Sequence, residues 1–443
     1  MTTASAERVL LLDGQTTQAL ACARSLGRAG ATVLVASARR RPLASWSCYC
    51  ERQIQLPDES IDSFAQLRQS AAMLGATLVL PLTERSCLLL NAERGEWQRE
   101  GITVAAPDAT TLEQAFDKAH TIRVAERCGI AVPTTRVPSA LAECGDIAAE
   151  LGLPCVVKGR FSSAWMGTHF LRDTGTSYVR TPEELEAAVL RHRQGEYWPV
   201  VQRFVPGRGK GIFTVSHGGR PLAWFAHERL RDVRPTGSGS SLRRAAALDP
   251  RLERPAERLL REMRWDGPAM VEFRDDGEHE PYLIEVNGRF WGSLQLAISA
   301  GVDFPQLWLS ALRQKAAPVP QPYRTDVTLR WLWGDAKRLL YVMAGPPPGF
   351  PGAFPSRLQG LREVLGAQPP GTRSETWDPA DPWPAVGEWV QGIGELLARR
   401  SGSDRDRGSA AVRRNRRLPH AFGRSGTSQP EVTTTPYRPG RIG

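Results

Sequence analysis

Lysine and cysteine are both scarce in this chain. Only 5 of its 57 basic residues are lysines, so arginine supplies almost every positive charge. The 7 cysteines are odd in number and all lie within the first 155 residues, which favours free thiols in a reducing compartment over a secreted disulfide framework. No run of about 18 apolar residues is present, so a membrane span is not expected. The first residues lack the basic and apolar pattern of a secretory leader. A cytoplasmic location is therefore expected.

The net charge of +10 is concentrated near the C-terminal end. Residues 399–443 contain 11 arginines against 3 acidic residues, a balance of +8, so the rest of the chain is nearly neutral. This tail is rich in Ser, Gly, Arg and Pro, a composition that predicts disorder. Because the basic charge lies in a solvated tail rather than on a folded face, nucleic acid is not an expected partner.

The pattern of apolar runs predicts two folded domains and a small module before the tail. Residues 1–107 alternate short strands with helices, which predicts an open parallel α/β domain. Residues 108–315 predict an α+β domain with an antiparallel sheet. Residues 316–398 predict a small C-terminal module with a strand at Val327–Trp333, on which Trp331 and Trp333 alternate, and a helix near 389–398.

The elements expected in residues 108–315 begin with a single helix at about 111–128. Strands are expected at Cys155–Lys158, Val200–Phe204, Ile212–Ser216, Pro221–His227, Met270–Arg274 and Tyr282–Val286, with one long helix at about 251–263. The Gly/Ser-rich stretch Arg234–Ser241 predicts a loop. Two roles stay open for this loop, a flexible connector or a segment that closes over a substrate.

The most specific motif is a pair of strands that each carry a glutamate in apolar surroundings, Glu272 and Glu285. On neighbouring strands the two can share one face, and Asn287 shares it because side chains alternate with a period of two. These oxygen ligands suit Mg²⁺ held together with substrate phosphates, and Arg289 adds a planar cation for phosphate oxygens. The alternative, polar residues that merely face water, is disfavoured because unpaired carboxylates in apolar runs are costly.

Two of the rare lysines precede this carboxylate pair along the chain. Lys158 ends an apolar strand and is followed by a glycine, and Lys118 lies in the helix that opens the region. A lysine at the end of a strand can reach a nucleotide phosphate as a point charge. A lone lysine is more often an ordinary surface cation, but the scarcity and placement of these two favour phosphate binding.

Four motifs in this order resemble the ATP-grasp superfamily, in particular its carbamoyl-phosphate-synthase-like and biotin-carboxylase-like branch. They are Asp117–Lys118 with Gly-Ile-Ala-Val-Pro133, Val-Val-Lys-Gly159, Val-Val-Gln-Arg-Phe-Val-Pro-Gly207, and the set Glu272, Glu285, Asn287 and Arg289. The resemblance covers residues 108 to about 312. It implies a two-subdomain ATP-grasp fold behind the superfamily's usual N-terminal α/β domain, with ATP and Mg²⁺, or alternatively Mn²⁺, as cofactors.

The resemblance also implies a role for each candidate site residue. Lys118 and Lys158 are expected to contact the ATP phosphates, and Glu272, Glu285 and Asn287 to hold one or two Mg²⁺ ions. Arg289 and Lys158 are expected to act on the transferred phosphate. The adenine hinge is expected at Gln202, Arg203, Phe204 and Val205, and Arg229 or Arg231 is expected to add a phosphate or carboxylate contact. Loop 160–167 departs from the superfamily's pattern, because it has one glycine where many relatives have several.

Three functions remain open on the sequence alone. The leading hypothesis is an ATP-dependent ligase that activates a small-molecule carboxylate as an acyl phosphate and joins it to an amine-type nucleophile. The alternatives are a bicarbonate-activating carboxylase of the same superfamily and a non-catalytic ATP-binding regulatory protein. The full set of Glu272, Glu285, Asn287 and Arg289 argues against the last, because a pure binder has no need of it. A homodimer is the expected assembly.

Overall fold

The structure, a computed structural model, describes residues 7–171, 173–314 and 322–397. The chain divides into two units, Met1–Gly392 and Ile393–Gly443, and nearly all of the described residues belong to the first. The basic tail expected at 399–443 lies outside the described residues, whereas the helix expected near 389–398 is present as a helical segment over 383–397. None of the helices that the structure describes is both long and apolar enough to cross a membrane.

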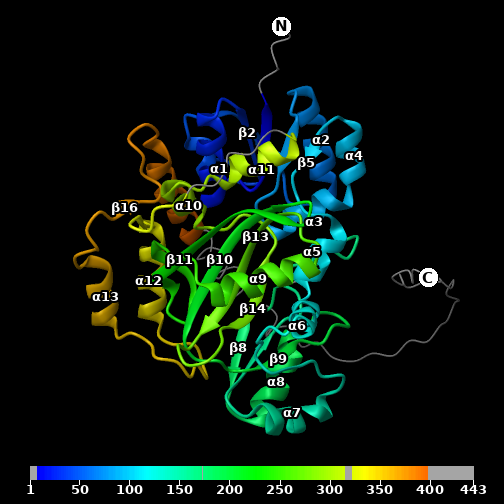
Figure 1. The fold of residues 1–443 in the computed structure, drawn as a ribbon, viewed down its shortest axis with the longest axis vertical. Helices are drawn as coiled ribbons and strands as arrows, with labels where there is room; N and C mark the ends of the chain where they lie inside the picture. The colour runs from blue at the N-terminus through cyan, green and yellow to red at the C-terminus, as the bar shows by residue number, and fades with distance from the viewer. Residues whose placement is uncertain (1–6, 172, 315–321, 398–443) are drawn as a thin grey trace, which may run out of the picture. The chain divides into compact units, whose positions relative to one another are not determined.

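The N-terminal part, coloured blue to cyan at the top of Figure 1, contains a five-stranded, all-parallel sheet, as expected. Its strand order is β3-β2-β1-β4-β5. Its elements are β1 (Arg8–Leu11), α1 (Thr17–Arg28), β2 (Thr32–Ser37), η1 (Leu43–Trp46), β3 (Cys50–Gln55), α2 (Ile61–Met73), β4 (Leu78–Leu80), α3 (Glu84–Ala92), α4 (Arg94–Arg99) and β5 (Thr103–Val104), followed by α5 (Ala109–Phe116) and α6 (Lys118–Arg127). Strands β1, β2 and β4 are apolar runs because a parallel sheet is covered on both faces.

The single helix predicted over about 111–128 is wrong, because the chain breaks at Asp117. The side chain of Asp117 accepts hydrogen bonds from the backbone N–H groups of Ala119 and His120 and thereby caps α6. A carboxylate that satisfies free N–H groups at a helix start stabilises that start. Lys118 is consequently the first residue of a helix rather than a residue within one.

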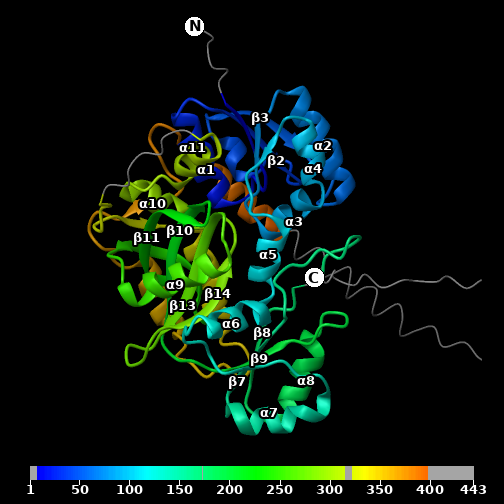
Figure 2. The same ribbon diagram turned by 45° about the vertical axis from the view of Figure 1, so that its right-hand side comes forward.

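Residues 135–203 form a smaller antiparallel sheet with its own hydrophobic core, which we call the small sheet. Its elements are β6 (Thr135–Arg136), η2 (Leu141–Glu143), α7 (Cys144–Leu151), β7 (Cys155–Lys158), β8 (Thr176–Val179), α8 (Pro182–His192) and β9 (Val200–Arg203), with strand order β6-β9-β7-β8. The two helices pack on one side of this sheet, in the lower part of Figure 2. Strand β8 is an edge strand.

The larger sheet, which we call the central sheet, has seven strands in the order β14-β13-β10-β11-β12-β15-β16. Its elements are β10 (Arg208–His217), β11 (Arg220–Arg234), β12 (Ser238–Ala246), α9 (Pro250–Glu262), β13 (Gly267–Asp275), β14 (Tyr282–Asn287), α10 (Leu294–Ala300), α11 (Phe304–Leu312), β15 (Thr328–Arg330), α12 (Leu332–Ala344), α13 (Arg357–Leu365) and β16 (Arg373–Ser374). Every pair is antiparallel except β15 with β16. The expected antiparallel sheet is confirmed, and β15 from the predicted C-terminal module extends it.

Two sequence predictions about this sheet are corrected. The stretch Arg234–Ser241 is the turn and start of a long hairpin, since β11 runs to Arg234 and β12 begins at Ser238. The strand predicted at Val327–Trp333 ends at Arg330, and α12 begins two residues later. Trp331 and Trp333 therefore do not alternate on one strand, because Trp333 lies in the helix.

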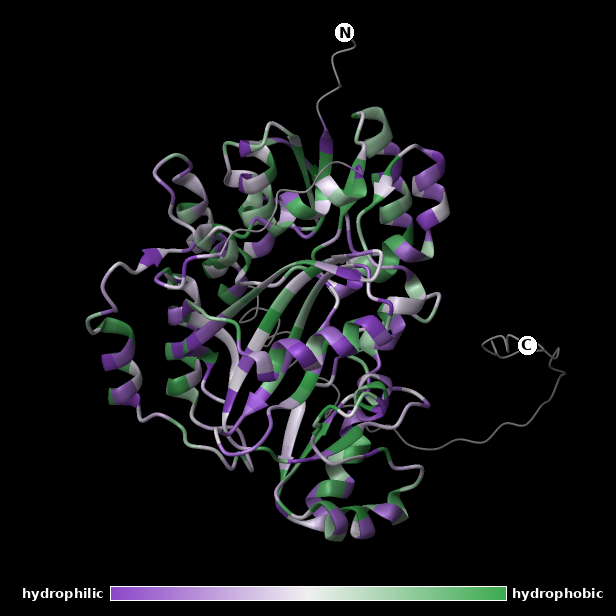
Figure 3. Ribbon diagram, in the orientation of Figure 1, coloured by the Kyte–Doolittle hydropathy of each residue, from purple (hydrophilic) through white to green (hydrophobic). Residues whose placement is uncertain are grey.

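Helices cover both faces of the central sheet. Phe213 and Phe225 pack with α1, α10 and α11 in one core, which also joins this sheet to the N-terminal sheet. Ile212 and Val271 pack with α9 on the other side. Helix α9 buries its leucines against the sheet and turns charged residues outward, which appear purple in Figure 3. The site described below lies where the central sheet faces the small sheet.

Candidate functional site

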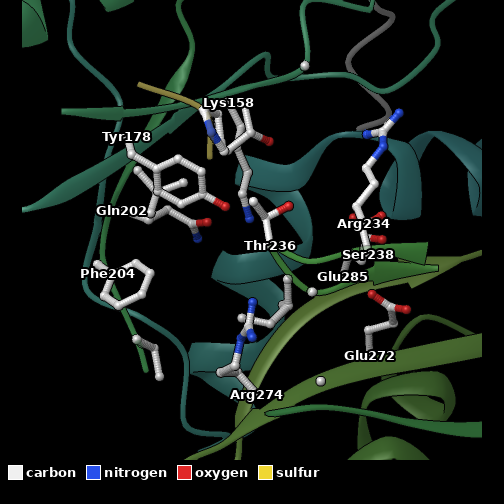
Figure 4. A pocket seen from close by; sticks show the side chains of 18 of the residues that line it. Lys158, Tyr178, Gln202, Phe204, Arg234, Thr236, Ser238, Glu272, Arg274 and Glu285 are labelled. Carbon is white, nitrogen blue, oxygen red and sulfur yellow. The ribbon is translucent and has the colours of Figure 1, made fainter. Parts of the chain in front are cut away.

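A cavity of about 580 Å³ lies between the small sheet and the central sheet. Figure 4 shows Lys158, Tyr178, Gln202 and Phe204 on one side of it and Glu272 and Glu285 on the other. The first group comes from β7, β8, β9 and the segment directly after β9, and the second from β13 and β14. Two separately built sheets therefore supply the opposite walls of one site.

The two glutamates are direct cross-strand partners of the β13–β14 pair, so they share one face of the sheet as predicted. Burial acts to raise the pKa of Glu285, but Lys118 and Lys158 and a hydrogen bond from Asn287 outweigh it and hold that pKa below its usual value. Burial raises the pKa of Glu272, and the nearby charge of Glu285 adds to the rise, while an ion pair with Arg229 opposes it.

Asn287 and Arg289 lie directly beside Glu285. The side-chain amide of Asn287 donates to a carboxylate oxygen of Glu285 at 3.1 Å. The guanidinium of Arg289 donates to the carbonyl of Phe290 at 3.0 Å and to the amide oxygen of Asn287 at 3.4 Å. Neither residue is among those that line the cavity. The structure thus places Asn287 and Arg289 next to the carboxylate pair but not in the cavity wall.

The two predicted lysines both line the cavity and face the carboxylates. Burial lowers the pKa of Lys158, opposed by the charge of Glu285 and assisted by that of Lys118. The ammonium group of Lys118 donates to the hydroxyl of Ser162 at 2.8 Å. Ser162 belongs to the loop after Lys158, so this contact fixes the loop against the start of α6.

The four residues of the predicted hinge all line the cavity. Gln202 is buried and donates from its side-chain amide to the hydroxyl of Thr135 at 3.1 Å. The ring of Phe204 stands at 6.3 Å from that of Tyr178, edge to face. This end of the cavity therefore offers aromatic surface, whereas the end near Glu272 offers charge.

The two candidate arginines on β11 have different surroundings. The Arg229 guanidinium lines the cavity and pairs with Glu272. Arg231 is not among the lining residues, and its guanidinium donates to both carboxylate oxygens of Asp335 at 2.7 and 2.8 Å and to Gln368 at 2.6 Å. Of the two, only Arg229 is in position to act on a molecule in the cavity.

The loop after Lys158 forms a short hairpin in which Trp165 pairs with Phe170. Both rings pack against the core of the N-terminal sheet, and the Arg85 guanidinium lies 4.1 Å from the centre of the Phe170 ring. The hairpin thus reaches from the small sheet to the N-terminal domain. The single glycine of loop 160–167 predicted a departure from the superfamily's pattern but not these aromatic contacts.

Several lining residues were not predicted from the sequence. Arg274, Tyr178 and Thr236 line the cavity, as do Pro347 and Phe354 from the segment after α12. Arg274 lies two residues beyond Glu272 on β13, and this alternation was a usable signal. Thr236 belongs to the Gly/Ser-rich stretch Arg234–Ser241, for which the sequence leaves open a role in closing over a substrate. Tyr178, Pro347 and Phe354 come from an edge strand and an irregular segment, and no local pattern marks them.

Glu84, the first residue of α3, is electrostatically coupled to Arg289 and Glu285 but is not among the residues that line the cavity. Burial raises its pKa, Arg289 opposes the rise and Glu285 adds to it.

Comparisons with known proteins agree with this architecture. A family model described as ATP-grasp in the biosynthetic pathway with Ter operon matches residues 222–334. The uncharacterized protein y4rH of Sinorhizobium fredii (strain NBRC 101917 / NGR234) is 29% identical over 202 residues, which cover 42% of this chain and 39% of that protein. The chain thus spans about two fifths of the length of this curated relative.

Among solved structures, biotin carboxylase from Campylobacter jejuni superposes with a TM-score of 0.58 at 16% identity, over 72% of this chain and 74% of that one. N5-carboxyaminoimidazole ribonucleotide synthetase from Thermus thermophilus gives 0.55 at 18% identity, over 72% and 81%. L-amino acid ligase from Bacillus licheniformis gives 0.50 at 21% identity, over 69% and 74%.

The chain therefore has the ATP-grasp fold, and the resemblance recognised in its sequence is confirmed at the level of fold. More particularly, an N-terminal parallel sheet precedes the two ATP-grasp sheets, and the fold is similar to those of biotin carboxylase and N5-carboxyaminoimidazole ribonucleotide synthetase.

Proposed function

We propose that this protein is an ATP- and Mg²⁺-dependent ligase that activates a carboxylate as an acyl phosphate and joins it to an amine-type nucleophile. The observation that carries the proposal is that Glu272, Glu285, Lys118 and Lys158 all line one cavity, with both lysines close enough to lower the pKa of Glu285, beside a wall of aromatic and apolar side chains. Phosphates and adenine need these two kinds of surface, at opposite ends of one site.

The residues of the carboxylate wall fit the expected metal. Glu272, Glu285 and the amide oxygen of Asn287 form an all-oxygen set on one sheet face, which would hold Mg²⁺, and the ion would supply positive charge against the phosphate oxygens. Arg229 forms an ion pair with Glu272 in this structure. When ATP and Mg²⁺ bind, its guanidinium would instead contact a phosphate oxygen. Gln202, Phe204 and Val205 would hold adenine at the other end.

In the proposed reaction, a substrate carboxylate oxygen attacks the γ-phosphorus of ATP and the bond to the ADP oxygen breaks. Lys118 and Lys158 hold the phosphate oxygens and offset the charge that moves to ADP. The amine then attacks the acyl carbon, phosphate leaves with its oxygen, and the amine loses a proton. Water must be kept from the acyl phosphate because it would hydrolyse it, and the loop after Lys158 contributes Ser162 to the cavity wall.

The test is release of ADP and phosphate from Mg-ATP across a panel of amino acids, small carboxylates, bicarbonate and amines. We expect release only when a carboxylate and an amine are both present, with one phosphate for each amide formed. Release that needs bicarbonate instead would identify the carboxylase alternative. ATP binding without release under any combination would favour a non-catalytic binder.

A matched pair of variants links this activity to the site. Glu285→Gln keeps size and hydrogen bonding but removes the carboxylate charge, so we expect turnover to fall by about 100-fold or more. Glu280→Gln removes an exposed carboxylate from the loop between β13 and β14, and turnover should stay at the wild-type level. Equal activity of the two variants would contradict the assignment of Glu285.

We also propose a cytoplasmic location and a homodimeric assembly. The seven cysteines are all free among the described residues, in agreement with a reducing cytoplasm. A homodimer stays a prediction, and sedimentation of the purified protein measures it. The identity of the carboxylate and the amine is left to the substrate panel.

A further inference from the structure

The segment between α12 and α13 crosses from the central sheet to the small sheet. We call residues 345–354 the strap. Pro347 and Phe354 of the strap line the cavity, and the Arg180 side chain, next to β8, donates to the carbonyls of Gly349 at 3.2 Å and Phe350 at 3.4 Å. The strap therefore forms part of the cavity wall and is also bound to the sheet on the other side.

The closest contact of the strap is between backbones. A Cβ atom built on Gly349 would lie 2.3 Å from the carbonyl oxygen of Tyr178, in the edge strand β8. Real Cβ atoms do not approach a carbonyl this closely, and Gly349 also has a φ of +72°, which side chains disfavour. Only glycine allows the strap to lie against β8 in this way.

Tyr178 joins this contact to the nucleotide end of the cavity. Its ring lies 5.0 Å from that of Phe350 in the strap and 6.3 Å from that of Phe204 in the hinge. The three rings form a row from the strap through the small sheet to the hinge. A movement of β8 away from the central sheet would have to break the first of these ring contacts.

The root of the strap is fixed to the central sheet. Asp335 in α12 is buried and pairs with Arg231 of β11 and Arg330 of β15. Arg338, one turn further along α12, donates to the carbonyl of Asp232 at 2.7 Å. Three consecutive prolines, residues 346–348, then stiffen the start of the strap. Because α12 is fixed to the central sheet and the prolines are stiff, the strap restrains the movement of β8, which it contacts.

We propose that the strap is a latch that holds the small sheet closed on the central sheet, and that nucleotide exchange requires its release from Tyr178 and Arg180. The latch rests on contacts within the protein alone, whereas its effect on nucleotide exchange rests on the proposed function. The two parts therefore need separate measurements.

The chain supplies a matched control for the critical glycine. Gly349 follows three prolines and Gly371 follows two, and their φ values are +72° and +73°. A Cβ on Gly371 meets nothing within 4 Å. Gly349→Ala and Gly371→Ala thus carry the same backbone strain, and only the first adds a collision with β8.

The first measurement is amide hydrogen exchange of residues 176–179 in the full chain without nucleotide. We expect exchange about tenfold faster in Gly349→Ala than in Gly371→Ala, a difference that corresponds to about 1.4 kcal/mol. Equal exchange rates in the two variants would overturn the latch. This readout needs no ligand, so it stands even if the protein does not bind ATP.

The second measurement is the rate at which a fluorescent ATP analogue is displaced by excess Mg-ATP. We expect release about tenfold faster from Gly349→Ala than from Gly371→Ala. Equal release rates would overturn control of exchange by the strap. Absence of analogue binding to the wild-type chain would overturn both the proposed function and that control, while hydrogen exchange still decides the latch.

If Gly349→Ala does not fold, the variant Arg180→Ala tests the latch by the same hydrogen-exchange measurement. Arg180→Ala removes the two hydrogen bonds to the strap from an exposed side chain. Its control is Arg136→Ala, which removes an exposed ion pair with Glu150 within the small sheet. Faster exchange of 176–179 in the first alone supports the latch, and equal rates overturn it.

Discussion

The buried carboxyl of Glu375 shows how strongly surroundings set the charge of a single residue. Glu375 lies beside β16 and forms an ion pair with Arg243 of β12, and both side chains are buried. Burial raises the pKa of Glu375 from about 4.5 to about 7, because the attraction of Arg243 only partly offsets it and Glu388 adds repulsion. This residue consequently titrates close to neutral pH.

A raised pKa makes the folded state bind a proton more tightly than the unfolded state. The stabilisation from Glu375 is therefore complete below about pH 4.5 and is lost as pH rises through 7, with a total on the order of 3 kcal/mol. We expect the stability of the wild type relative to Glu375→Gln to fall over this range. Thermal unfolding of both proteins at several pH values measures the difference.

The control for this titration is Glu257→Gln, which changes an exposed carboxylate paired with Arg261 on α9. The stability difference between the wild type and this variant should change little with pH. A difference for Glu375→Gln that stays constant between pH 4.5 and 7 would show that Glu375 titrates near its ordinary value.

Helix α6 connects a local cap to the position of a site lysine. Asp117 caps this helix and pairs with Arg160 at 2.6 Å, so it fixes both Lys118 and the start of the hairpin. We expect Asp117→Ala to cost about 1 kcal/mol or more in the free energy of unfolding and to raise the KM for ATP about tenfold. Urea unfolding and steady-state kinetics measure these two effects.

The variant Thr181→Ala is a control that separates loss of stability from a change in the KM for ATP. Thr181 caps α8 through the backbone N–H of Glu184, away from either lysine of the site, so this variant should lose similar stability without a change in the KM for ATP. A raised KM in both variants would mean that general loosening, rather than the place of Lys118, sets the affinity.

The hairpin after Lys158 depends on its two aromatic rings. Trp165 packs against the core of the N-terminal sheet, whereas Met166, next to it, is 40% exposed. We expect Trp165→Ala to speed proteolytic cleavage within residues 160–171 about tenfold, and Met166→Ala to leave the rate unchanged. Time courses of limited proteolysis on the intact chain measure both. Similar cleavage of the two variants would mean that the Trp165 contact does not hold the hairpin.

The elements that the sequence predicted well are those with strong periodic signals. The apolar runs of β1, β2 and β4 and the alternating strands of the central sheet were found because burial on one or two faces leaves a regular pattern. The helix break at Asp117 was not predicted, because a capping residue within a helical pattern differs little from an ordinary polar residue. Strand β12 escaped because Gly237, Gly239 and neighbouring serines resemble a loop, although hairpin pairing keeps most of them in a strand.

The candidate site divides in the same way. Glu272, Glu285 and Lys158 could be predicted as site residues because they are charged residues within apolar strands, where an unpaired charge is costly. Tyr178, Pro347 and Phe354 could not, because Tyr178 lies on a short edge strand and the other two lie in the strap, which is irregular. Long-range packing of irregular segments leaves no mark on the local sequence.

At the scale of the whole molecule, the last part of the described chain ties the first part to the central sheet. Asp381 is fully buried against α1, where it accepts a hydrogen bond from Arg24 at 2.8 Å. Its carboxylate also accepts from the Ser47 hydroxyl at 2.7 Å and from the backbone N–H of Cys48 at 2.8 Å. Residues more than 330 positions apart thus meet in one buried polar cluster.

The contribution of this cluster to the free energy of unfolding can be compared with that of Asp378, which lies in the same turn. Asp378 pairs with Arg28 on the exposed side of α1. Asp381→Ala leaves the buried cation of Arg24 without its partner, so we expect a loss of about 3–5 kcal/mol in the free energy of unfolding. Asp378→Ala removes a surface pair and should cost about 1 kcal/mol or less. Denaturant unfolding of the two variants measures both, and losses of equal size would mean that the C-terminal segment is not held to the N-terminal domain by this buried pair.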